Sequence, residues 1–515
     1  MGPNATHLGP GSYDFSKYIA YAELCKELGI KWSLQLSYHY APGWYTTQCI
    51  TDYGYDPRVR NEAGEVANGH FMPFSPSSPV WGDYCKDWAE AAVEALAPYM
   101  GTVIDDIMPG NEMMCNIHIP TSYDEYTKQA WKDYTGNPSA TLPIGFASTA
   151  QFQEFRSIQW YNAMKTLVDD VKNKTKTLGK SVKVSTKLVP YMLHSTWMLR
   201  SGIFPKVFDL IEEDSMDVIA VDFYPPTSHY YQTLYRRDKP MYLAEFNKGG
   251  GADCTAAEIE GWIQDGVTNY NMKYATFFAW DASGDIWDIT EEEKTGLKNA
   301  ADWVLTLSGP IVQKTDVVRY NISTAVLGED ADTAWTLNSD SNKRMRAAMA
   351  LTSVLNPLSN FAYEIGIGSD PDAAANIYQV TQNTTIADTT TDKAIYLIED
   401  HSTTVNITSG SKYVTTASSY VYSSPSYLVR NTENLSSGTQ IYGSTPKWSN
   451  GNRKLTTNLS GYTRYVDTYN GYPLAIKKDN TFFLGQDTAW EIVDDSTDTP
   501  LDQLIADMLY DLGID

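Results

Sequence analysis

Strand-like and helix-like segments alternate along the first 306 or so residues, and no other feature of the sequence constrains the fold as strongly. In "SYDFSKYIAYAELCKELG" apolar residues recur at helical spacing and Gly29 follows as a helix stop, after which "IKWSLQLS" is typical of a strand. A helix in "SPVWGDYCKDWAEAAVEALAPYMG" and a strand in "TVIDDIM" repeat the succession. Such alternation over roughly 300 residues predicts a parallel sheet with crossover helices, and its commonest closed form is the (β/α)8 barrel.

The expected barrel strands are numbered along this succession. We take "IKWSLQLS" as the second strand, "TVIDDIM" as the fourth, "SMDVIAVDFYPP" as the sixth, "KPMYLAEFN" as the seventh and "YATFFAWD" as the eighth. Each is short, rich in β-branched or aromatic residues, and followed by polar or turn-forming residues, as expected of strands whose carboxyl ends carry the functional loops.

The character of the sequence changes after Gly309 and Pro310. Residues 310–405 mix strands with one clear helix, whereas residues 406–495 are rich in Ser, Thr, Tyr, Asn and Gly and contain short alternating runs typical of antiparallel strands. A chain of 515 residues is also too long for one compact core. We therefore expect three domains: a barrel over 1–306, an α/β domain over 310–405, and a β-rich domain with a terminal helix over 406–515.

Charge and cysteine content exclude several classes of function. The formal net charge is −24 and the pI is near 4.6, so no basic face is available for nucleic acid or for an anionic membrane surface, and a neutral or cationic substrate is expected. No apolar run is long enough to span a bilayer. The five cysteines are scattered without a C-x-x-C pair, which indicates neither a disulfide framework nor a zinc site, and no metal site is predicted.

The composition of the chain bears on whether the protein is secreted. Sequons of the N-x-[ST] type and a Ser/Thr/Asn-rich second half favour a secreted or cell-surface protein, the sequons starting at Asn4, Asn173, Asn321, Asn383, Asn406, Asn434 and Asn458. Such sequons also arise by chance in a Ser/Thr-rich sequence, so a cytoplasmic protein is the alternative.

Two glutamates stand where expected strands end. Glu112 follows "VIDDIMPGN" and Glu245 follows "PMYLA". In a (β/α)8 barrel the catalytic groups lie at the carboxyl ends of the strands. Two carboxylates that face each other across a barrel mouth suit glycoside hydrolysis, in which one protonates the leaving oxygen and the other attacks the anomeric carbon or activates a water. The alternative for either glutamate is an exposed turn residue.

Other strand ends offer side chains suited to a sugar, with aromatic rings for its C–H faces and Asp, Asn and His for its hydroxyls. The candidate sugar contacts are Asn111, Tyr38, His39, Trp44, Asp222, Tyr224 and Trp280. Several have a structural alternative: Asn111 as a turn cap, Asp222 and Tyr224 as buried polar residues, and Trp280 as barrel core.

Several stretches, taken in order, resemble clan-A glycoside hydrolases, and most closely glycoside hydrolase family 42, the β-galactosidase-like enzymes. They are "GPGSYDFSKYIAYAELCKELGIKWSLQLSYHYAPGWY", "FSPSSPVWGDYCKDWAEAAVEAL", "TSYDEYTKQAWKDYTG", "SMDVIAVDFYPP" and "TFFAWDASG", and they cover roughly residues 9–306. The resemblance implies a (β/α)8 barrel followed by a flavodoxin-like domain and a small β-rich domain. Because only about eight residues precede "GPGSYDFS", the first strand of the barrel is expected to be absent or truncated.

The resemblance also implies roles for the candidate residues. The Asn-Glu pair matches the acid/base signature of the clan, which casts Glu112 as acid/base, Asn111 as the residue that holds the sugar 2-hydroxyl, and Glu245 as the nucleophile of a retaining mechanism. It further implies an oligo- or polysaccharide substrate, no cofactor, and a homo-oligomer such as a trimer. Two rival functions stay open: an inverting glucanase or amylase on the same barrel, and a non-catalytic carbohydrate-binding or surface protein.

Overall fold

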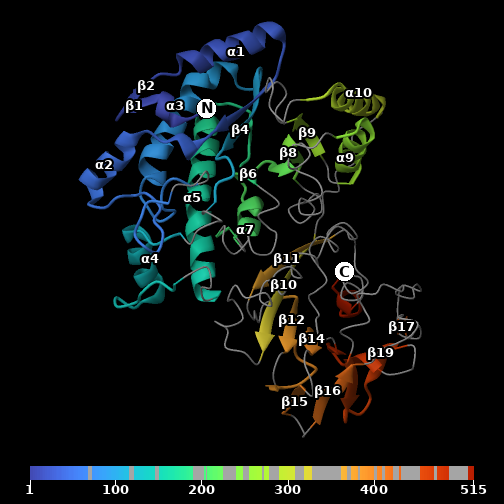
Figure 1. Ribbon diagram of the computed structural model, residues 1–515. Helices are drawn as coiled ribbons and strands as arrows, with labels where there is room; N and C mark the ends of the chain where they lie inside the picture. Colours follow the sequence, from blue (N-terminus) through green and yellow to red (C-terminus); the bar gives the residue numbers. More distant parts are fainter. Residues whose placement is uncertain are drawn as a thin grey trace. The chain divides into compact units, whose positions relative to one another are not determined.

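The computed structural model of the chain divides into two compact units, Met1–Asp316 and Val317–Asp515 (Figure 1). The structure describes residues 1–67, 72–114, 121–144, 150–188, 202–203, 206–223, 239–246, 254–269, 272–277, 289–307, 318–327, 361–367, 373–380, 383–398, 403–408, 412–420, 428–430, 453–468, 473–485 and 508–514. Within these ranges, no helix is both long enough and apolar enough to cross a membrane.

The first unit is organised around parallel strands that pair in chain order. They are β3 (Trp32–Leu36), β4 (Ile104–Pro109), β5 (Lys183–Val184), β6 (Lys187–Leu188), β7 (Ile219–Phe223), β8 (Met241–Phe246) and β9 (Met272–Phe277). The strands β3-β4-β5 form one sheet and β6-β7-β8-β9 form another. Parallel strands joined by helices make this an α/β fold, which confirms the expectation from the alternating sequence.

The two parallel sheets meet at the short segment 183–188. Between β5 and β6, the Ser185 N–H donates to the carbonyl of Ile107 at 3.1 Å, and the Thr186 hydroxyl donates to the carbonyl of Pro109 at 2.8 Å. Segment 183–188 therefore stays attached to β4 on one side while β6 pairs with β7 on the other. This segment brings the ends of β4 and of β7 to the same region of the molecule.

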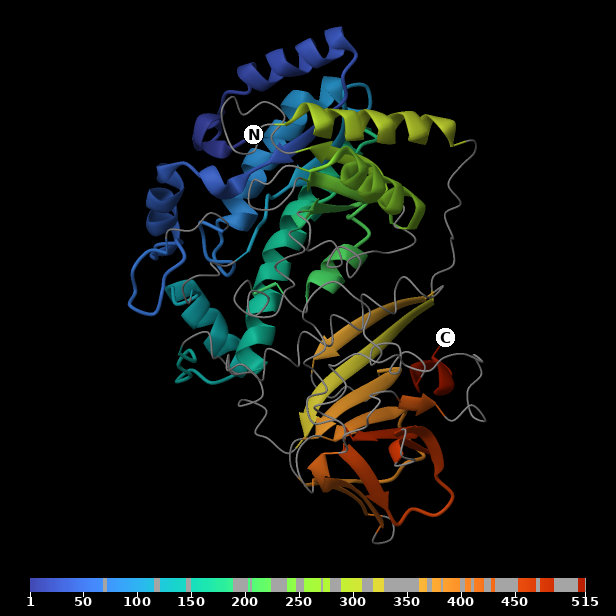
Figure 2. The same cartoon turned by 45° about the vertical axis from the view of Figure 1, so that its right-hand side comes forward.

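Helices precede, separate and follow these strands along the chain. They are α1 (Ser16–Leu28), α2 (Gly43–Tyr53), α3 (Lys86–Leu96), α4 (Glu125–Thr135), α5 (Ala150–Thr177), α7 (Val207–Glu212), α9 (Ala256–Asn269) and α10 (Glu291–Thr306). Short helical turns are η1 (Pro3–Ala5), η2 (Tyr38–Tyr40), η3 (Trp81–Cys85) and η4 (Ala97–Tyr99). As the sequence predicts, α1 stops at Gly29, whose φ of +68° is left-handed. Helix α3 buries one apolar face, including Trp88, Ala92 and Leu96, and packs on α5. Figure 2 shows α9 and α10 lying side by side next to β9.

The order of the strands corrects the expected numbering. Strand β3 pairs directly with β4, with Leu34 opposite Ile107 and Leu36 opposite Pro109, so no strand lies between them. If β4 is the fourth barrel strand, then residues 32–36 form the third strand and not the second. Met1 lies next to the end of β3: its carbonyl accepts a hydrogen bond from the N–H of Ser37, the residue that follows the strand, at 2.7 Å. Nearby, β1 (His7–Gly9) and β2 (Ser12–Tyr13) form an antiparallel pair.

The second unit contains a mixed sheet of eight strands and a second sheet of four. The parallel part of the larger sheet has the order β11 (Phe361–Ile367), β10 (Val318–Leu327), β12 (Ala375–Val380), β14 (Ala394–Ile398) and β21 (Thr481–Gly485). It continues antiparallel through β20 (Pro473–Lys478), β19 (Thr463–Thr468) and β17 (Leu428–Arg430). Numbered along the chain, the five parallel strands have the order 2-1-3-4-5, which is that of flavodoxin-like sheets.

The smaller sheet of the second unit has the order β13 (Thr384–Ile386), β15 (Thr404–Ile407), β16 (Lys412–Tyr420) and β18 (Arg453–Thr457). Its buried apolar residues, among them Val405 and Val414, form one core with Ile398 and Phe483 of the larger sheet. The last parallel strand of the larger sheet, β21, follows the antiparallel strands β17, β19 and β20 in the chain, whereas the first, β10, precedes them. Both sheets take strands from the two sides of residue 405, where the sequence suggested a domain boundary. The flavodoxin-like domain and the separate β-rich domain stay predictions.

Candidate active site

The parallel strands of the first unit carry two clusters of interacting polar side chains, one around Asp106 and one around Lys187. Asp106 of β4 is almost fully buried and accepts hydrogen bonds from the hydroxyls of Ser33 on β3 and Ser185, the latter at 3.2 Å. Burial raises the pKa of Asp106 to about 6, although the two serine hydroxyls act in the opposite direction. The hydrogen bonds of Asp106 tie β3 and β4 to the segment that follows β5.

The turn after β4 fixes the positions of Asn111 and Glu112. Gly110 has φ +94°, and a Cβ there would lie 2.8 Å from Met113 Cγ and 3.1 Å from Thr186 Oγ1, so only glycine fits. The Asn111 side-chain carbonyl accepts a hydrogen bond from the Gln35 amide of β3. Glu112 itself has φ +48°, a left-handed conformation that is uncommon for a glutamate and recurs at functional sites.

Segment 183–188 holds this turn from the other side. The backbone of Asn111 forms a parallel bridge with Lys187, and the Glu112 N–H donates to the Lys187 carbonyl at 3.3 Å. The indole of Trp160 on α5 donates to the Met113 carbonyl at 2.6 Å. Backbone contacts therefore tie Glu112 to the residue that carries the central cation of the site.

Lys187 is that cation, and it contacts carboxylates from two further strands. Its ammonium forms ion pairs with Asp222 of β7, at 3.3 Å, and with Glu245 of β8. Asp222 and Glu245 are opposite each other in the pairing of β7 with β8. The side chain of Lys187 is 5% exposed, that of Asp222 is 0% exposed and that of Glu245 is 15% exposed, so the ion pairs are largely shielded from water.

The charges of this cluster act strongly on one another. Burial would lower the pKa of Lys187, but the charges of Asp222, Glu245 and Glu112 raise it above its usual value. Burial raises the pKa of Asp222 well above its usual range; the charge of Lys187 opposes this, while the charges of Glu245 and Glu112 add to it. The cluster therefore combines a buried ammonium whose pKa is raised by its acidic neighbours with a buried carboxyl group whose pKa is raised by burial.

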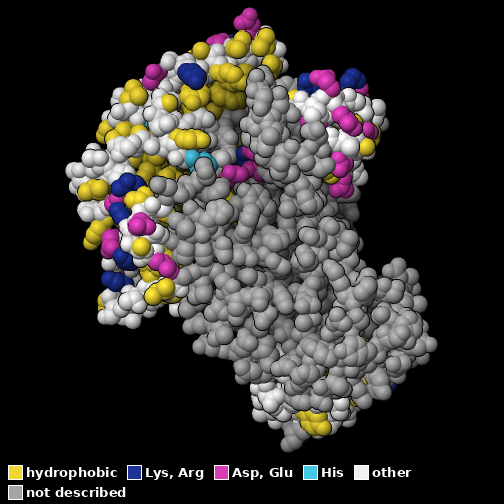
Figure 3. Space-filling model, viewed as in Figure 1, with side chains coloured by type: hydrophobic (Ala, Val, Ile, Leu, Met, Phe, Trp, Pro, Cys, Tyr) yellow, Lys and Arg dark blue, Asp and Glu magenta, His cyan; other side chains and the backbone are white. Residues whose placement is uncertain are grey.

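The structure brings together four of the residues selected from the sequence: Asn111, Glu112, Asp222 and Glu245. Asp222, however, is fully buried against Lys187, which is the structural alternative and not an exposed sugar contact. On the face shown in Figure 3, acidic, basic and histidine side chains gather at a hollow near the centre.

The expected sugar contacts Tyr38 and Trp44 both pack against other aromatic rings. The Tyr38 ring is fully buried, edge-on to the rings of Trp81 and Trp88. Trp44 donates its indole N–H to the His7 carbonyl at 3.0 Å and packs edge-on against the His7 ring. Tyr38 belongs to the aromatic packing around α3, which the sequence does not distinguish from a sugar platform, whereas Trp44 is partly buried and its sugar contact stays a prediction. Tyr224 and Trp280, the other two aromatic candidates, lie outside the described residues.

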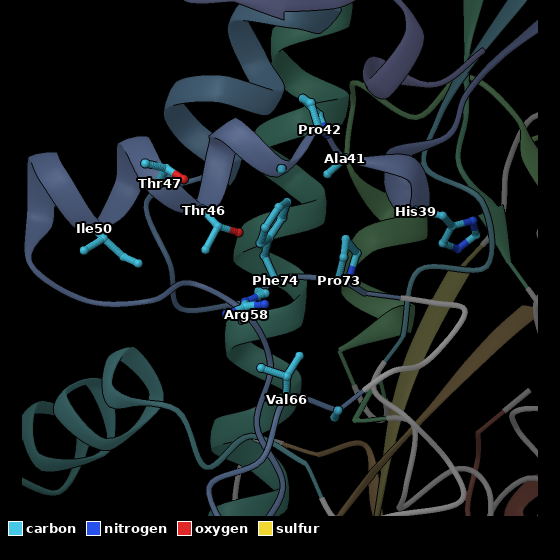
Figure 4. Close-up of a pocket in the computed structure, with 12 residues that line it drawn as sticks. His39, Ala41, Pro42, Thr46, Thr47, Ile50, Arg58, Val66, Pro73 and Phe74 are labelled. Carbon is cyan, nitrogen blue, oxygen red and sulfur yellow. The ribbon is translucent and has the colours of Figure 1, made fainter.

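His39 lines a cavity of about 840 Å³ that begins just after β3 (Figure 4). Thr46 of α2 and Phe74 and Arg58 of the following segment lie around the same space. A cavity of this size and mixed polarity is in the range of ligand pockets. The role of His39 in sugar binding stays a prediction.

Lys187 and Gln35 were not identified from the sequence. The signal for Lys187 was its place in "VKVSTKLV", where a lysine follows an alternating strand-like run close to its end. A lysine there is ordinarily interpreted as a solvated residue. Gln35 alternates with Ser33 on β3, and both face polar partners. Among the residues that the structure describes, no group of three His, Cys, Asp or Glu side chains has an arrangement that could hold a metal ion.

No protein-family model matches the sequence, and no curated protein matches it. Solved structures do match over nearly the whole chain. A β-galactosidase from the psychrophilic Marinomonas ef1 has 12% identity and a TM-score of 0.55, covering 98% of this chain and 85% of that one. A cold-adapted β-galactosidase from Rahnella sp. R3 has 12% identity and a TM-score of 0.56, covering 99% and 83%.

A third match is Gan42B, a β-galactosidase of glycoside hydrolase family 42, with 9% identity and a TM-score of 0.54, covering 99% of this chain and 83% of that one. At identities this low a structural likeness shows the fold and not the activity. The resemblance expected from the sequence is confirmed at that level: the chain is similar in fold to β-galactosidases of glycoside hydrolase family 42.

Proposed function

We propose that the protein is a retaining glycoside hydrolase that cleaves β-glycosidic bonds, with Glu112 as acid/base and Glu245 as nucleophile. The observation that carries this proposal is the meeting of carboxyl groups from the β4 turn, β7 and β8 around one buried ammonium. The similarity in fold to β-galactosidases supports the same class of reaction. Two carboxyl groups in different electrostatic surroundings are what this chemistry requires.

In the first half-reaction, an oxygen of Glu245 bonds to the anomeric carbon while the glycosidic C–O bond breaks. The bonding electrons leave with the aglycone oxygen, which takes a proton from Glu112 and departs as an alcohol. In the second half-reaction, Glu112 takes a proton from water as the water oxygen attacks the anomeric carbon, and the Glu245 ester bond breaks. The sugar leaves with its original anomeric configuration.

The surroundings of the two glutamates suit these unequal roles. Glu245 forms an ion pair with the ammonium of Lys187, which holds the carboxylate of the proposed nucleophile in place. Glu112 instead neighbours the buried carboxyl group of Asp222, whose pKa is raised well above its usual range. Two adjacent carboxyl groups in a buried site hold one proton between them more readily than two negative charges. The proposal therefore assigns the nucleophile to the glutamate that pairs with Lys187 and the acid/base to the glutamate beside Asp222.

The substrate and the wider architecture follow as parts of the same proposal. We propose that strands β3 to β9 belong to a (β/α)8-type barrel with Asn111 placed to hold the sugar 2-hydroxyl. The cavity beside His39 would accept further sugar units, which favours an oligo- or polysaccharide. Tyr224 and Trp280 stay candidates for sugar contacts, and a secreted homo-oligomer, such as a trimer, stays the expected state of the protein.

The test is a panel of 4-nitrophenyl glycosides, assayed with the wild-type protein, Glu112→Gln and Glu245→Gln. Glu213→Gln serves as the matched control, because Glu213 is also a partly buried glutamate that pairs with a lysine, Lys165, but lies outside the site. We expect both site variants to lose at least about 10³-fold in kcat while the control stays near wild type. A Glu245→Gln protein with wild-type turnover would refute the assignment.

A further inference from the structure

The three charged partners of Lys187 reach it from three different strand ends. Asp222 comes from β7 and Glu245 from β8, and the charge of Glu112 acts on it from the turn after β4. Its own backbone is held at two edges, since Lys187 pairs with Ala220 of β7 and forms a bridge with Asn111. The backbone from which the Lys187 side chain extends is therefore fixed between β7 and the turn after β4.

We propose that Lys187 is a positioning residue. It holds the Glu245 carboxylate for attack, and it then stabilises the negative charge on the Asp222–Glu112 carboxyl pair while Glu245 is esterified. This inference rests on the proposed function and assigns to its site a residue that neither the sequence motif nor the two-glutamate mechanism includes. The geometry that carries it is the placement of one ammonium in contact with Glu245 and, at 3.3 Å, with Asp222.

The need for such a residue follows from how charge moves during the reaction. The proposed mechanism starts from an ionised Glu245 and from one proton on the Glu112–Asp222 pair. When the C–O bond forms at Glu245, its negative charge disappears, and the shared proton leaves with the alcohol. The same step therefore removes a negative charge from one neighbour of Lys187 and creates one at the other. Attack by water reverses both changes, because its proton returns to the pair and Glu245 regains its charge.

A lysine suits this task better than an arginine. Its ammonium is a compact charge with three donors on a flexible stem, whereas a guanidinium binds carboxylates through a rigid planar fork. Because both partners already lie within ion-pair distance, a small movement of the amine changes which carboxylate it favours. An almost fully buried ammonium is screened little by salt, so its effect on both carboxylates is strong.

The test compares Lys187→Met, Lys187→Arg and a matched control, Lys172→Met. Lys172 is a partly buried lysine of the same unit, and its ion pair with Asp217 includes none of the carboxylates of the proposed site, although Asp217 also accepts from the Val184 N–H at 2.8 Å. The probes are 4-nitrophenyl and 2,4-dinitrophenyl β-D-galactopyranoside, and kcat and KM are measured from pH 4 to 9. Thermal unfolding of each variant monitors the fold.

We expect Lys187→Met to lower kcat/KM by about 10²-fold or more, as removal of a preorganised charge commonly does. Both limbs of its pH profile should move to higher pH by about one unit, because loss of a positive charge makes neighbouring carboxyl groups harder to ionise. Lys187→Arg should recover at least tenfold of the loss with limbs near their original positions, and Lys172→Met should stay within about twofold of wild type.

The outcomes separate the two proposals. If wild type turns over the probes and Glu245→Gln does not, but Lys187→Met keeps both its rate and its pH limbs, the function stands and the role of Lys187 is wrong. Equal loss in Lys187→Met and Lys187→Arg with unmoved limbs would also overturn it, since that pattern reflects packing alone. A wild-type protein that hydrolyses no glycoside of the panel would overturn both proposals.

Discussion

Replacement of Asp106 by asparagine should stabilise the protein at neutral pH. Asp106 is 2% exposed, and its pKa is raised from an ordinary 3.8 to about 6, first by burial and further by the charges of Asp105 and Asp217. Each unit of pKa difference between folded and unfolded states corresponds to about 1.4 kcal/mol. Ionised Asp106 therefore costs about 3 kcal/mol of folding free energy at pH 7.

The direction of the pH dependence follows from proton binding in the folded and unfolded states. Between pH 4 and 6 the folded protein holds a proton on Asp106 that the unfolded chain has lost, so this residue makes stability fall as pH rises through that window and then level off. Asparagine keeps the shape, and the hydroxyls of Ser33 and Ser185 can rotate to donate to its oxygen or accept from its amide. The gain at pH 7 should be about 1–3 kcal/mol, with almost none at pH 4.

The assay is urea unfolding followed by tryptophan fluorescence at pH 4.5, 5.5 and 7, for wild type and Asp106→Asn. The control is Asp302→Asn, because Asp302 is exposed and pairs with Lys298 on the surface of α10, where an ion pair contributes less than about 1 kcal/mol. An Asp106→Asn protein that is less stable than wild type at pH 7, or whose gain is independent of pH, would refute the reasoning.

Three further outcomes are expected. Gly110→Ala should lose about 1–3 kcal/mol of stability and most activity, because the φ of +94° and the Thr186 hydroxyl 3.1 Å from the added Cβ leave no room for it. Urea unfolding and 4-nitrophenyl glycoside turnover measure the two effects, and an unaffected variant would contradict this expectation. His7→Gln should remove a loss of stability between pH 6.5 and 4 of at most about 3.5 kcal/mol, because burial lowers the pKa of His7 to about 4 and the residue takes up a proton when the protein unfolds in acid. Unchanged pH dependence of thermal unfolding would count against this expectation. Proton NMR of the first product released from a β-glycoside should show the β anomer, whereas the α anomer would indicate an inverting enzyme.

The strands that carry the candidate site were largely predictable because their pattern is local. "WSLQL" and "IDDIMP" became β3 and β4, and "PMYLAEF" became β8, where periodicity and the turn signal of Pro109 and Gly110 suffice. The same patterns do not state which strands pair. The numbering of β3 was therefore wrong, since its direct pairing with β4 is a tertiary fact.

The side chains around the glutamates were less predictable. An aromatic ring after a strand suits both a sugar platform and a packed core, and only the positions of Trp81 and Trp88 decide that Tyr38 is core. Lys187 was missed because its burial depends on Asp222 and Glu245, which are distant in sequence. A buried lysine requires such partners, and no local pattern reports them.

The irregular segment 183–188 also sets the spacing of the strands that carry the candidate site. It lies between β4, which precedes Glu112, and β7, which carries Asp222, and its pairing with β4 shifts by one residue between Val184 and Lys187. One residue of strand register amounts to about 3.3 Å. Retaining and inverting glycosidases differ in carboxyl separation by a similar amount, about 5–5.5 Å against 6.5–9.5 Å. If the proposed function holds, a single insertion or deletion in this segment would change the separation of Glu112 and Glu245, and with it the stereochemical course of the reaction, without altering either glutamate.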